Sequence, residues 1–280
     1  MTQTIETLDA GDAITSRTTQ NKPRIIAIAN QKGGVGKTTT AINLATALAA
    51  VQKRVLLIDM DPQGNASTGL GLGREARTIN TYHVMMGEAK LSAAIHTTDI
   101  PGLEIMASGM DLSGIEIELI DTDRREYRLR DAIVATERDY DYILIDCPPA
   151  LGLLTINSLV AANTVLVPLQ CEFFALEGIS HINKTIERIK ARFNPGLDIG
   201  GIVLTMYDGR NNLSEMVAND VREFFGDTVY NTVIPRNVRV SEAPSHGRPV
   251  LIYDIKCAGS QAYLNLASEL IHRERQAMQA

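Results

Sequence analysis

One glycine-rich run stands out in this chain: Asn30-Gln31-Lys32-Gly33-Gly34-Val35-Gly36-Lys37-Thr38-Thr39-Thr40. A short apolar run, residues 25–29, precedes it, and residues 41–50 follow it with helical spacing of apolar side chains. This order predicts a strand, a loop and a helix that runs from about Lys37 to Ala50. Glycines let the backbone N–H groups of such a loop approach phosphate oxygens closely, and the helix offers its unpaired first N–H groups and the positive end of its dipole. The run therefore predicts a phosphate-binding loop.

The residues of this loop have individual expected roles. We expect Lys37 on the β- and γ-phosphates of a nucleotide and the Thr38 hydroxyl on Mg²⁺. The residues expected to contact the nucleotide are Gly33, Gly34, Val35, Gly36, Lys37, Thr38 and Thr39. The generic pattern has glycine where Gln31 stands, and here a second lysine, Lys32, comes directly before Gly33. The competing interpretation is a glycine-rich turn with two solvated lysines, but a strand, a helix and downstream acids all fall where a phosphate-binding loop needs them.

Composition limits the classes of protein that fit. The chain has 280 residues, 45% of them hydrophobic, which suits one large α/β domain or two small ones. The formal net charge is -6, so any contact with DNA must come from a local basic patch. Cys147, Cys171 and Cys257 are too widely spaced for a disulfide framework or a zinc site, which fits a reducing cytosol. No apolar run reaches the roughly 18 residues of a membrane span, and we expect no signal peptide because the first residues lack an apolar core.

Acidic residues follow two further apolar runs. Residues 55–58 lead into Asp59, and Asp61 follows two positions later. Ligands of open α/β sheets bind beyond the carboxyl ends of the strands, where both aspartates would lie. We expect Asp59 to hold a water of the Mg²⁺ shell and Asp61 to orient the water that attacks the γ-phosphate; the alternative is an acidic turn with local hydrogen bonds. Residues 142–145 lead into Asp146 in the same way, which predicts a second acid near the Mg²⁺.

The rest of the chain alternates between strands and helices. This order predicts an α/β fold: a single-domain, doubly wound, mostly parallel sheet flanked by helices. Further strands are expected at residues 103–107, 164–169, 199–206 and 228–234, and further helices at residues 78–86, 123–137 and 259–275 and ending near residues 193 and 225. In the helix 123–137 we expect Leu129, Ile133 and Val134 to face inward. Residues 1–22 are polar and lack a regular period, so we expect a flexible tail before a domain of residues 23–280.

Two of these helices have alternative interpretations. The helix that ends near residue 193 carries four basic or titratable side chains on one face: His181, Lys184, Arg188 and Arg192. A solvated face is the default, and contact of its lysine and two arginines with a DNA backbone is the alternative. The last helix is either packed on the core or an amphipathic membrane anchor. Glu269 and Glu274 offset its basic residues, so we expect packing.

Several motifs together resemble the ParA/MinD family of ATPases. The loop from Lys32 to Thr39 is similar to the deviant Walker A motif of that family, and Asp146-Cys147-Pro148-Pro149 is similar to its Walker B motif. Three further blocks are also similar: Asp61-Pro62-Gln63-Gly64-Asn65, Leu176-Glu177-Gly178, and the segment from Pro235-Arg236-Asn237 to Ser245-His246-Gly247. The blocks run in order through nearly the whole chain and most resemble the chromosomal, Soj-like branch.

The resemblance implies a homodimer in the ATP state, with the nucleotide between the subunits. Lys32 would reach across to the other subunit's phosphates and cancel the charge that builds on the transferring phosphoryl group. Asp61 would take the catalytic-water role, Asp146 would take the Walker B role at the Mg²⁺, and Gly33 would allow the close approach of the two subunits. The residues expected around the adenine are Met206, Pro235 and Asn237.

The resemblance also implies a function in DNA segregation. Soj-like proteins bind double-stranded DNA non-specifically as ATP dimers, and the matching arginines are Arg210 and Arg239. A ParB-type partner would stimulate weak ATP hydrolysis and release the dimer, and the protein would act in the cytoplasm on the nucleoid. The alternatives are a positioning ATPase on a membrane surface, as in MinD, and a relative that moves a non-chromosomal cargo. We expect no stable membrane association, because the last helix has a weak basic face.

Overall fold

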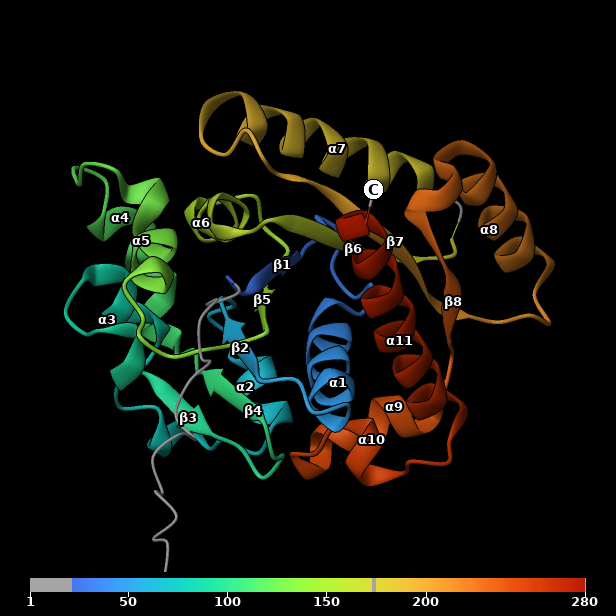
Figure 1. Cartoon of the computed structure of the whole chain (residues 1–280), viewed down its shortest axis with the longest axis horizontal. Coiled ribbons are helices and arrows are strands. Elements are labelled where there is room, and N and C mark those ends of the chain that lie inside the picture. Colours follow the sequence, from blue (N-terminus) through green and yellow to red (C-terminus); the bar gives the residue numbers. More distant parts are fainter. Residues whose placement is uncertain (1–21, 173–174, 280) are drawn as a thin grey trace, which may run out of the picture.

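One eight-stranded sheet forms the centre of the molecule (Figure 1). The computed structural model describes residues 22–172 and 175–279, so the predicted tail lies outside the described residues except for Lys22. The strand order is β3-β4-β2-β5-β1-β6-β7-β8. The strands are β1 (Arg24–Ile28), β2 (Val55–Asp59), β3 (Ile95–Thr97), β4 (Leu103–Met106), β5 (Tyr142–Asp146), β6 (Thr164–Gln170), β7 (Asp198–Tyr207) and β8 (Val229–Pro235). All pairs are parallel except β3 with β4.

Helices cover both faces of this sheet (Figure 1). The helices are α1 (Lys37–Ala50), α2 (Asn65–Gly69), α3 (Thr81–Met86), α4 (Ile115–Glu118), α5 (Arg128–Val134), α6 (Leu153–Ala161), α7 (Ala175–Arg192), α8 (Asn212–Phe225), α9 (Val238–Glu242), α10 (Val250–Tyr253) and α11 (Ala258–Gln279). Helices α3 to α8 pack on one face, and α1, α10 and α11 pack on the other. The predicted doubly wound, mostly parallel α/β domain is confirmed.

The alternation of side chains along β1 divides the core into two clusters. Ala27 packs under α6 and α7, whereas Ile26 and Ile28 pack under α1 and α11. Both neighbours of β1 in the sheet are parallel strands, so its residues are buried on both faces, as helix-covered parallel strands must be. None of the helices within residues 22–172 and 175–279 is long and apolar enough to cross a membrane.

The region around α5 differs from the sequence prediction. The helix was expected over residues 123–137, but α5 covers only Arg128–Val134, after a short 3-10 turn. Arg124 has φ 57°, a left-handed conformation that a continuing α-helix does not allow, so the helix begins later. Leu129 and Ile133 are buried as expected, but the expectation for Val134 was wrong, because its side chain is 79% exposed.

The last helix packs on the core, as expected. Helix α11 lies along α1 and β8, and its Leu266 and Leu270 are almost fully buried. The Glu269 carboxylate accepts hydrogen bonds from the backbone N–H groups of Asn231 and Thr232, at 2.8 and 2.9 Å. Glu269, which weakens the basic face of the helix, therefore has a structural role: it holds the exposed edge strand β8 to α11.

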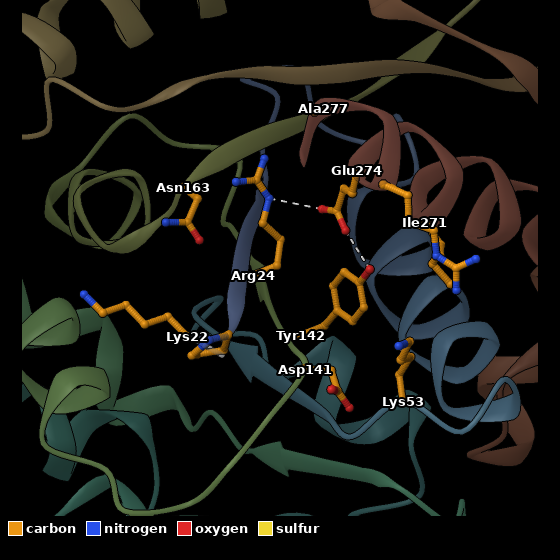
Figure 2. A pocket seen from close by; sticks show the side chains of 11 residues that line it. Lys22, Arg24, Lys53, Asp141, Tyr142, Asn163, Ile271, Glu274 and Ala277 are labelled. Carbon is orange, nitrogen blue, oxygen red and sulfur yellow. Dashed lines mark hydrogen bonds and ion pairs between the residues drawn. The ribbon is translucent and has the colours of Figure 1, made fainter. Parts of the chain in front are cut away.

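A second acid of α11 holds the start of β1. Glu274 Oε1 accepts a hydrogen bond from Arg24 Nε at 3.1 Å, and its Oε2 accepts one from the Tyr142 hydroxyl at 2.6 Å (Figure 2). These residues line a cavity of about 500 Å³ at the amino ends of β1 and β5. Burial, together with the hydrogen bond to Glu274, raises the pKa of the Tyr142 hydroxyl, so the tyrosine is a neutral donor. The contact joins the first residue of β1 to the helix that covers it.

Glu274→Ala should lower the free energy of unfolding by about 1–3 kcal/mol, because it leaves the buried Tyr142 hydroxyl without its acceptor. Urea denaturation followed by circular dichroism measures the change. Tyr142→Phe is the control. It removes the hydroxyl itself, so no buried donor is left without an acceptor, and the free energy of unfolding should fall by less. Equal losses for the two single variants would mean that the hydroxyl is satisfied in another way.

Candidate functional site

The glycine-rich loop joins β1 directly to α1, as predicted. Gly34 and Gly36 have φ of 74° and 88°, which side chains other than glycine rarely adopt. Asn30 anchors the start of the loop: its Nδ2 donates to the Pro168 carbonyl at 2.8 Å, and its Oδ1 accepts from the Lys32 N–H at 3.0 Å. The loop therefore has a fixed entry on β6 and a helix N-terminus at its exit.

Lys37 is the buried cation of this loop. The side chain is only 7% exposed, and its Nζ donates to the Lys32 carbonyl at 3.0 Å. Burial lowers the pKa of the ammonium, and the nearby Asp146 carboxylate opposes this change. A buried ammonium with one carbonyl partner still has free donors, which phosphate oxygens can accept.

Asp146 is a buried carboxylate without a partner. Its residue is fully buried, and neither of its oxygens has a hydrogen-bond partner among the described residues. Burial, with the charge of Asp59 next to it in the sheet, raises the pKa of the carboxyl well above its usual value. An ionised carboxylate in such a place is costly unless a cation pairs with it. The site therefore fits a hard divalent cation.

The ligand set at this place fits Mg²⁺ that is shared with a nucleotide. Among the residues that the structure describes, no group of three or more His, Cys, Asp or Glu side chains could form a complete metal cage. Mg²⁺ commonly takes one or two carboxylates and completes its shell with water and substrate phosphates. Asp146 and the Thr38 hydroxyl can supply that partial shell, since Thr38 lies in the first turn of α1 beside the buried carboxylate.

Asp59 holds the chain that follows β2. Its Oδ2 accepts from the N–H and the hydroxyl of Ser67, at 2.9 and 2.7 Å, and its Oδ1 accepts from the Asp61 N–H at 3.2 Å. Burial raises the pKa of this carboxyl to about 6, and the bonds from Ser67 oppose the rise. Asp59 thus positions Asp61, a role that the sequence did not indicate. Its predicted place in the Mg²⁺ shell stays a prediction.

Asp61 lies at the mouth of the site, half-buried. Its Oδ1 accepts a hydrogen bond from the Gln63 N–H at 3.0 Å. Its Oδ2 accepts none from the described residues, so this oxygen is available to a water. Gly64 follows with φ 62°, and a Cβ there would lie 2.3 Å from Arg77 Nη1. A side chain at this position would have to displace the Arg77 guanidinium.

Arg77 is a site residue that the sequence reading missed. The buried guanidinium donates to the carbonyls of Leu72, Gly64 and Ser108 and to the hydroxyl of Thr68. It fixes the turn after Asp61 from a position 13 residues downstream of Gly64. No motif marks such a role, because it depends on where the loop carbonyls meet in space.

The residues expected around an adenine come together. Gly36, Thr39, Met206, Pro235 and Asn237 line one cavity of about 200 Å³, next to the exit of the phosphate loop. Met206 has φ 51°, and a strained backbone of this kind in a non-glycine residue is typical of functional sites. The Thr205 hydroxyl donates to the Val35 carbonyl at 2.8 Å and ties this cavity to the phosphate loop.

The basic residues fall into two separate groups. Arg210 and Arg239 follow β7 and β8, whose last residues Tyr207 and Pro235 are paired in the sheet. Both arginines have acidic neighbours: Arg210 pairs with Asp208 at 2.9 Å, and Arg239 pairs with Glu242 at 2.9 Å. The other group, Lys184, Arg188 and Arg192, lies exposed on α7. The first two thus follow neighbouring strands of the sheet, and the other three lie on a different element.

Lys32 has a partner that the sequence reading missed. Its Nζ pairs with Glu172 Oε2 at 2.6 Å, with side-chain exposures of 43% and 46%. Glu172 follows β6, 140 residues away along the chain. The second lysine of the loop is therefore tethered on the surface of its own chain and does not point into its own phosphate site.

Comparison with known proteins agrees with this geometry. Residues 23–199 match a family model described as an AAA domain. The chain is 64% identical over 257 residues to the chromosome partitioning protein ParA of Caulobacter vibrioides, which covers 91% of this chain and 96% of that protein. It is 49% identical over 247 residues to the sporulation initiation inhibitor protein Soj of Bacillus subtilis, covering 88% and 98% of the two chains.

A solved structure of similar fold contains ligands. The cobyrinic acid a,c-diamide synthase from Mycobacterium smegmatis, with bound ATP analogue and magnesium, is similar with a TM-score of 0.80 and 36% identity, over 91% of this chain and 97% of that one. The phosphate loop, the buried Asp146 and these likenesses lead to one conclusion. The chain belongs to the ParA/Soj family of chromosome-partitioning ATPases.

Proposed function

We propose that this chain is an ATP-hydrolysing switch that dimerises with ATP and Mg²⁺, binds double-stranded DNA non-specifically, and segregates chromosomes or plasmids with a ParB-type partner. The observation that carries the proposal is the buried, unpaired Asp146 carboxylate beside Lys37 and the phosphate loop. Such a site is electrostatically incomplete until a cation and a phosphate chain enter it. The family to which the chain belongs supports the choice of ATP.

Each residue of the site has one task in the hydrolysis. The loop N–H groups and Lys37 would hold the phosphates, Thr38 and Asp146 would hold the Mg²⁺, and Asp59 would hold a water of its shell. The metal would neutralise charge on the β- and γ-phosphate oxygens. Asp61 orients the attacking water with its free Oδ2. Lys32 of a second copy stabilises the charge that develops on the transferred phosphoryl group.

Two features support the dimer. A Cβ at Gly33 would meet nothing within 4 Å in its own chain, and its φ is not in the left-handed region, so nothing in the monomer requires glycine there. Close approach of a second copy supplies a reason. Large apolar side chains are also exposed near this edge: Met110 at 53%, Ile117 at 78% and Leu151 at 44%. Met110 lies beside Pro62 and Gln63, in the turn after Asp61.

Arg210 and Arg239 support the DNA contact. Arg210 lies in the loop after β7 and Arg239 in α9 after the neighbouring strand β8, and the Arg210 side chain is 90% exposed. A chain with net charge -6 repels DNA at long range, so a small basic patch binds weakly alone. A dimer presents the patch twice, and the affinity for DNA rises steeply with the number of phosphate contacts. DNA binding that follows the nucleotide state would place the protein on the nucleoid in the cytoplasm. The α7 cations are a further candidate contact.

The proposal predicts that duplex of random sequence binds at least tenfold more tightly with ATP than with ADP, because only the dimer doubles the patch. Fluorescence anisotropy at several salt concentrations measures this, and affinity should fall steeply with salt. Arg210→Glu should weaken binding at least tenfold while the dimer persists. Lys90→Glu makes the same charge change at an exposed site far from the patch and should have little effect. Equal affinity in both nucleotide states would overturn the switch.

A second prediction concerns Asp61. Asp61→Ala should retain ATP-dependent dimerisation and DNA binding but lose at least about 10²-fold in hydrolysis rate, because the water is no longer oriented. Phosphate release and size-exclusion chromatography measure the two properties. Asp99→Ala, an exposed acid elsewhere, is the matched control. Loss of nucleotide binding in Asp61→Ala would show that the role assigned to Asp61 is wrong.

A third prediction concerns the Lys32–Glu172 pair. Lys32 must leave Glu172 before it can reach a second copy, so Glu172→Gln should increase the dimer fraction at limiting ATP. An exposed pair contributes about 0.2–1 kcal/mol, which corresponds to at most about a fivefold gain in the equilibrium constant of dimerisation. Lys32→Ala should instead abolish the stimulation of hydrolysis by dimerisation. Sedimentation with a non-hydrolysable ATP analogue reads the dimer fraction. An unchanged or smaller fraction for Glu172→Gln would contradict the tether.

A further inference from the structure

A cavity of about 630 Å³ lies between the end of α3 and helix α5. The two helices pack on each other at the side of the molecule that lies away from β8 (Figure 1). Two stretches of chain line the cavity, within residues 84–92 and residues 128–138, and none of the residues that we assign to the nucleotide or to DNA is among them. Small-molecule sites commonly have volumes of about 300–1,000 Å³, so this cavity is large enough for a ligand of its own.

The guanidinium of Arg128, the first residue of α5, is the unusual group in this cavity. Its Nε is buried and has no hydrogen-bond acceptor among the described residues. The side chain reaches from α5 to the end of α3, because a Cβ at Gly87 would lie 3.4 Å from Arg128 Nη1. Four neighbouring arginines within residues 124–138 each have an acidic partner, whereas no ion pair of the described residues includes Arg128. A buried donor without an acceptor is costly, so this arginine is placed to receive an acceptor from outside the chain.

The charges around the cavity favour a single negative charge on the ligand. The charged residues that line it are Lys90, Arg128, Asp131, Glu137 and Arg138. Asp131 and Arg138 already have partners outside the cavity, at 3.0 and 2.7 Å. The other three, two cations and one acid, belong to no ion pair of the described residues and leave one net positive charge. A ligand with several negative charges would find too few cations here, whereas a monoanion would balance the site.

The walls of the cavity favour an apolar body on the same ligand. Val84 and Leu91 line it and are almost fully buried in the protein, and Ala132 and Ala135 line it from α5 and the residue after this helix. Small-molecule sites commonly combine such apolar walls with a few polar groups that fix the orientation of the ligand. The planar fork of a guanidinium, with its Nε–H and one Nη–H, matches the two oxygens of a carboxylate.

We propose that the cavity between α3 and α5 binds a small monocarboxylate with an apolar body, and that Arg128 is the partner of its carboxylate. The carboxylate supplies the acceptor that the buried Nε lacks, and the apolar body fills the space beside Val84 and Leu91. The site is separate from the phosphate loop and from Arg210 and Arg239. It does not rest on the proposed switch, because no step of ATP hydrolysis or DNA binding uses these residues.

The test uses the full chain with Mg²⁺ and ADP, so that the nucleotide site is filled, and octanoate as the probe. A ligand-observed NMR titration should give a Kd of about 1 mM or below, as a ligand of this size allows. Arg128→Gln removes the charge partner, and Ala135→Phe narrows the cavity without changing its charge. Each should weaken octanoate binding at least tenfold. Arg188→Gln and Ala258→Phe make the same two changes at exposed sites elsewhere and should bind as the parent does.

Two further measurements separate the proposal from simpler explanations. Octanamide has the same apolar body without the charge, and inorganic phosphate has charge without the body, so both should bind at least tenfold more weakly than octanoate. Thermal melting shows that each variant folds, and octanoate should raise the Tm of the parent chain but not that of Arg128→Gln. Absence of octanoate binding by the parent, equal binding of octanamide or phosphate, or unchanged binding by Arg128→Gln would each overturn the proposal. Equal losses in the control variants would do so as well.

Discussion

The buried charge of Asp146 is the constraint on which the rest of the site depends. The sheet order β2-β5-β1 brings the carboxyl ends of three strands together, so Asp59, Asp146 and the loop before Lys37 become neighbours. One buried ammonium faces two buried carboxylates; burial raises the pKa of both acids, and the charge of Asp59 raises that of Asp146 further. A packed α/β core cannot relax to hydrate them. The fold thus leaves the site with unbalanced buried charges, which Mg²⁺ and phosphates can pair.

The surrounding hydrogen bonds keep that deficit in place. Asn30 fixes the entry of the phosphate loop on β6, and Asp59 and Arg77 together fix the turn that carries Asp61. Asn30 and Arg77 donate to backbone carbonyls, and Asp59 accepts from Ser67 and Asp61, so the loop and the turn are held in place around Asp146. Preorganisation of this kind makes a polar site bind its ligand strongly, because folding already supplies the free energy that holds the charges in place.

Sequence patterns predicted the elements that depend on local periodicity. Helix α1 has the expected bounds, and each predicted central strand is present, because continuous apolar runs between turns leave little alternative. The short antiparallel β3 was not predicted, since three residues carry no period. The start of α5 was missed because Arg124 adopts a left-handed conformation that no residue type announces. Such errors arise where tertiary contacts override local preference.

The residues of the site likewise divide into those that sequence patterns predicted and those that they missed. Motifs marked Lys37, Asp61 and Asp146, whose chemistry requires their residue types at strand ends. Ser67, Arg77 and Glu172 carried no signal, because each acts through a contact that only the folded chain creates. Lys32 is the instructive case. The motif identified it as a lysine for phosphates, but in a single chain it pairs with Glu172 on the surface. The role that we propose for Lys32 involves a second copy of the chain, so the contacts of a single chain could not indicate it.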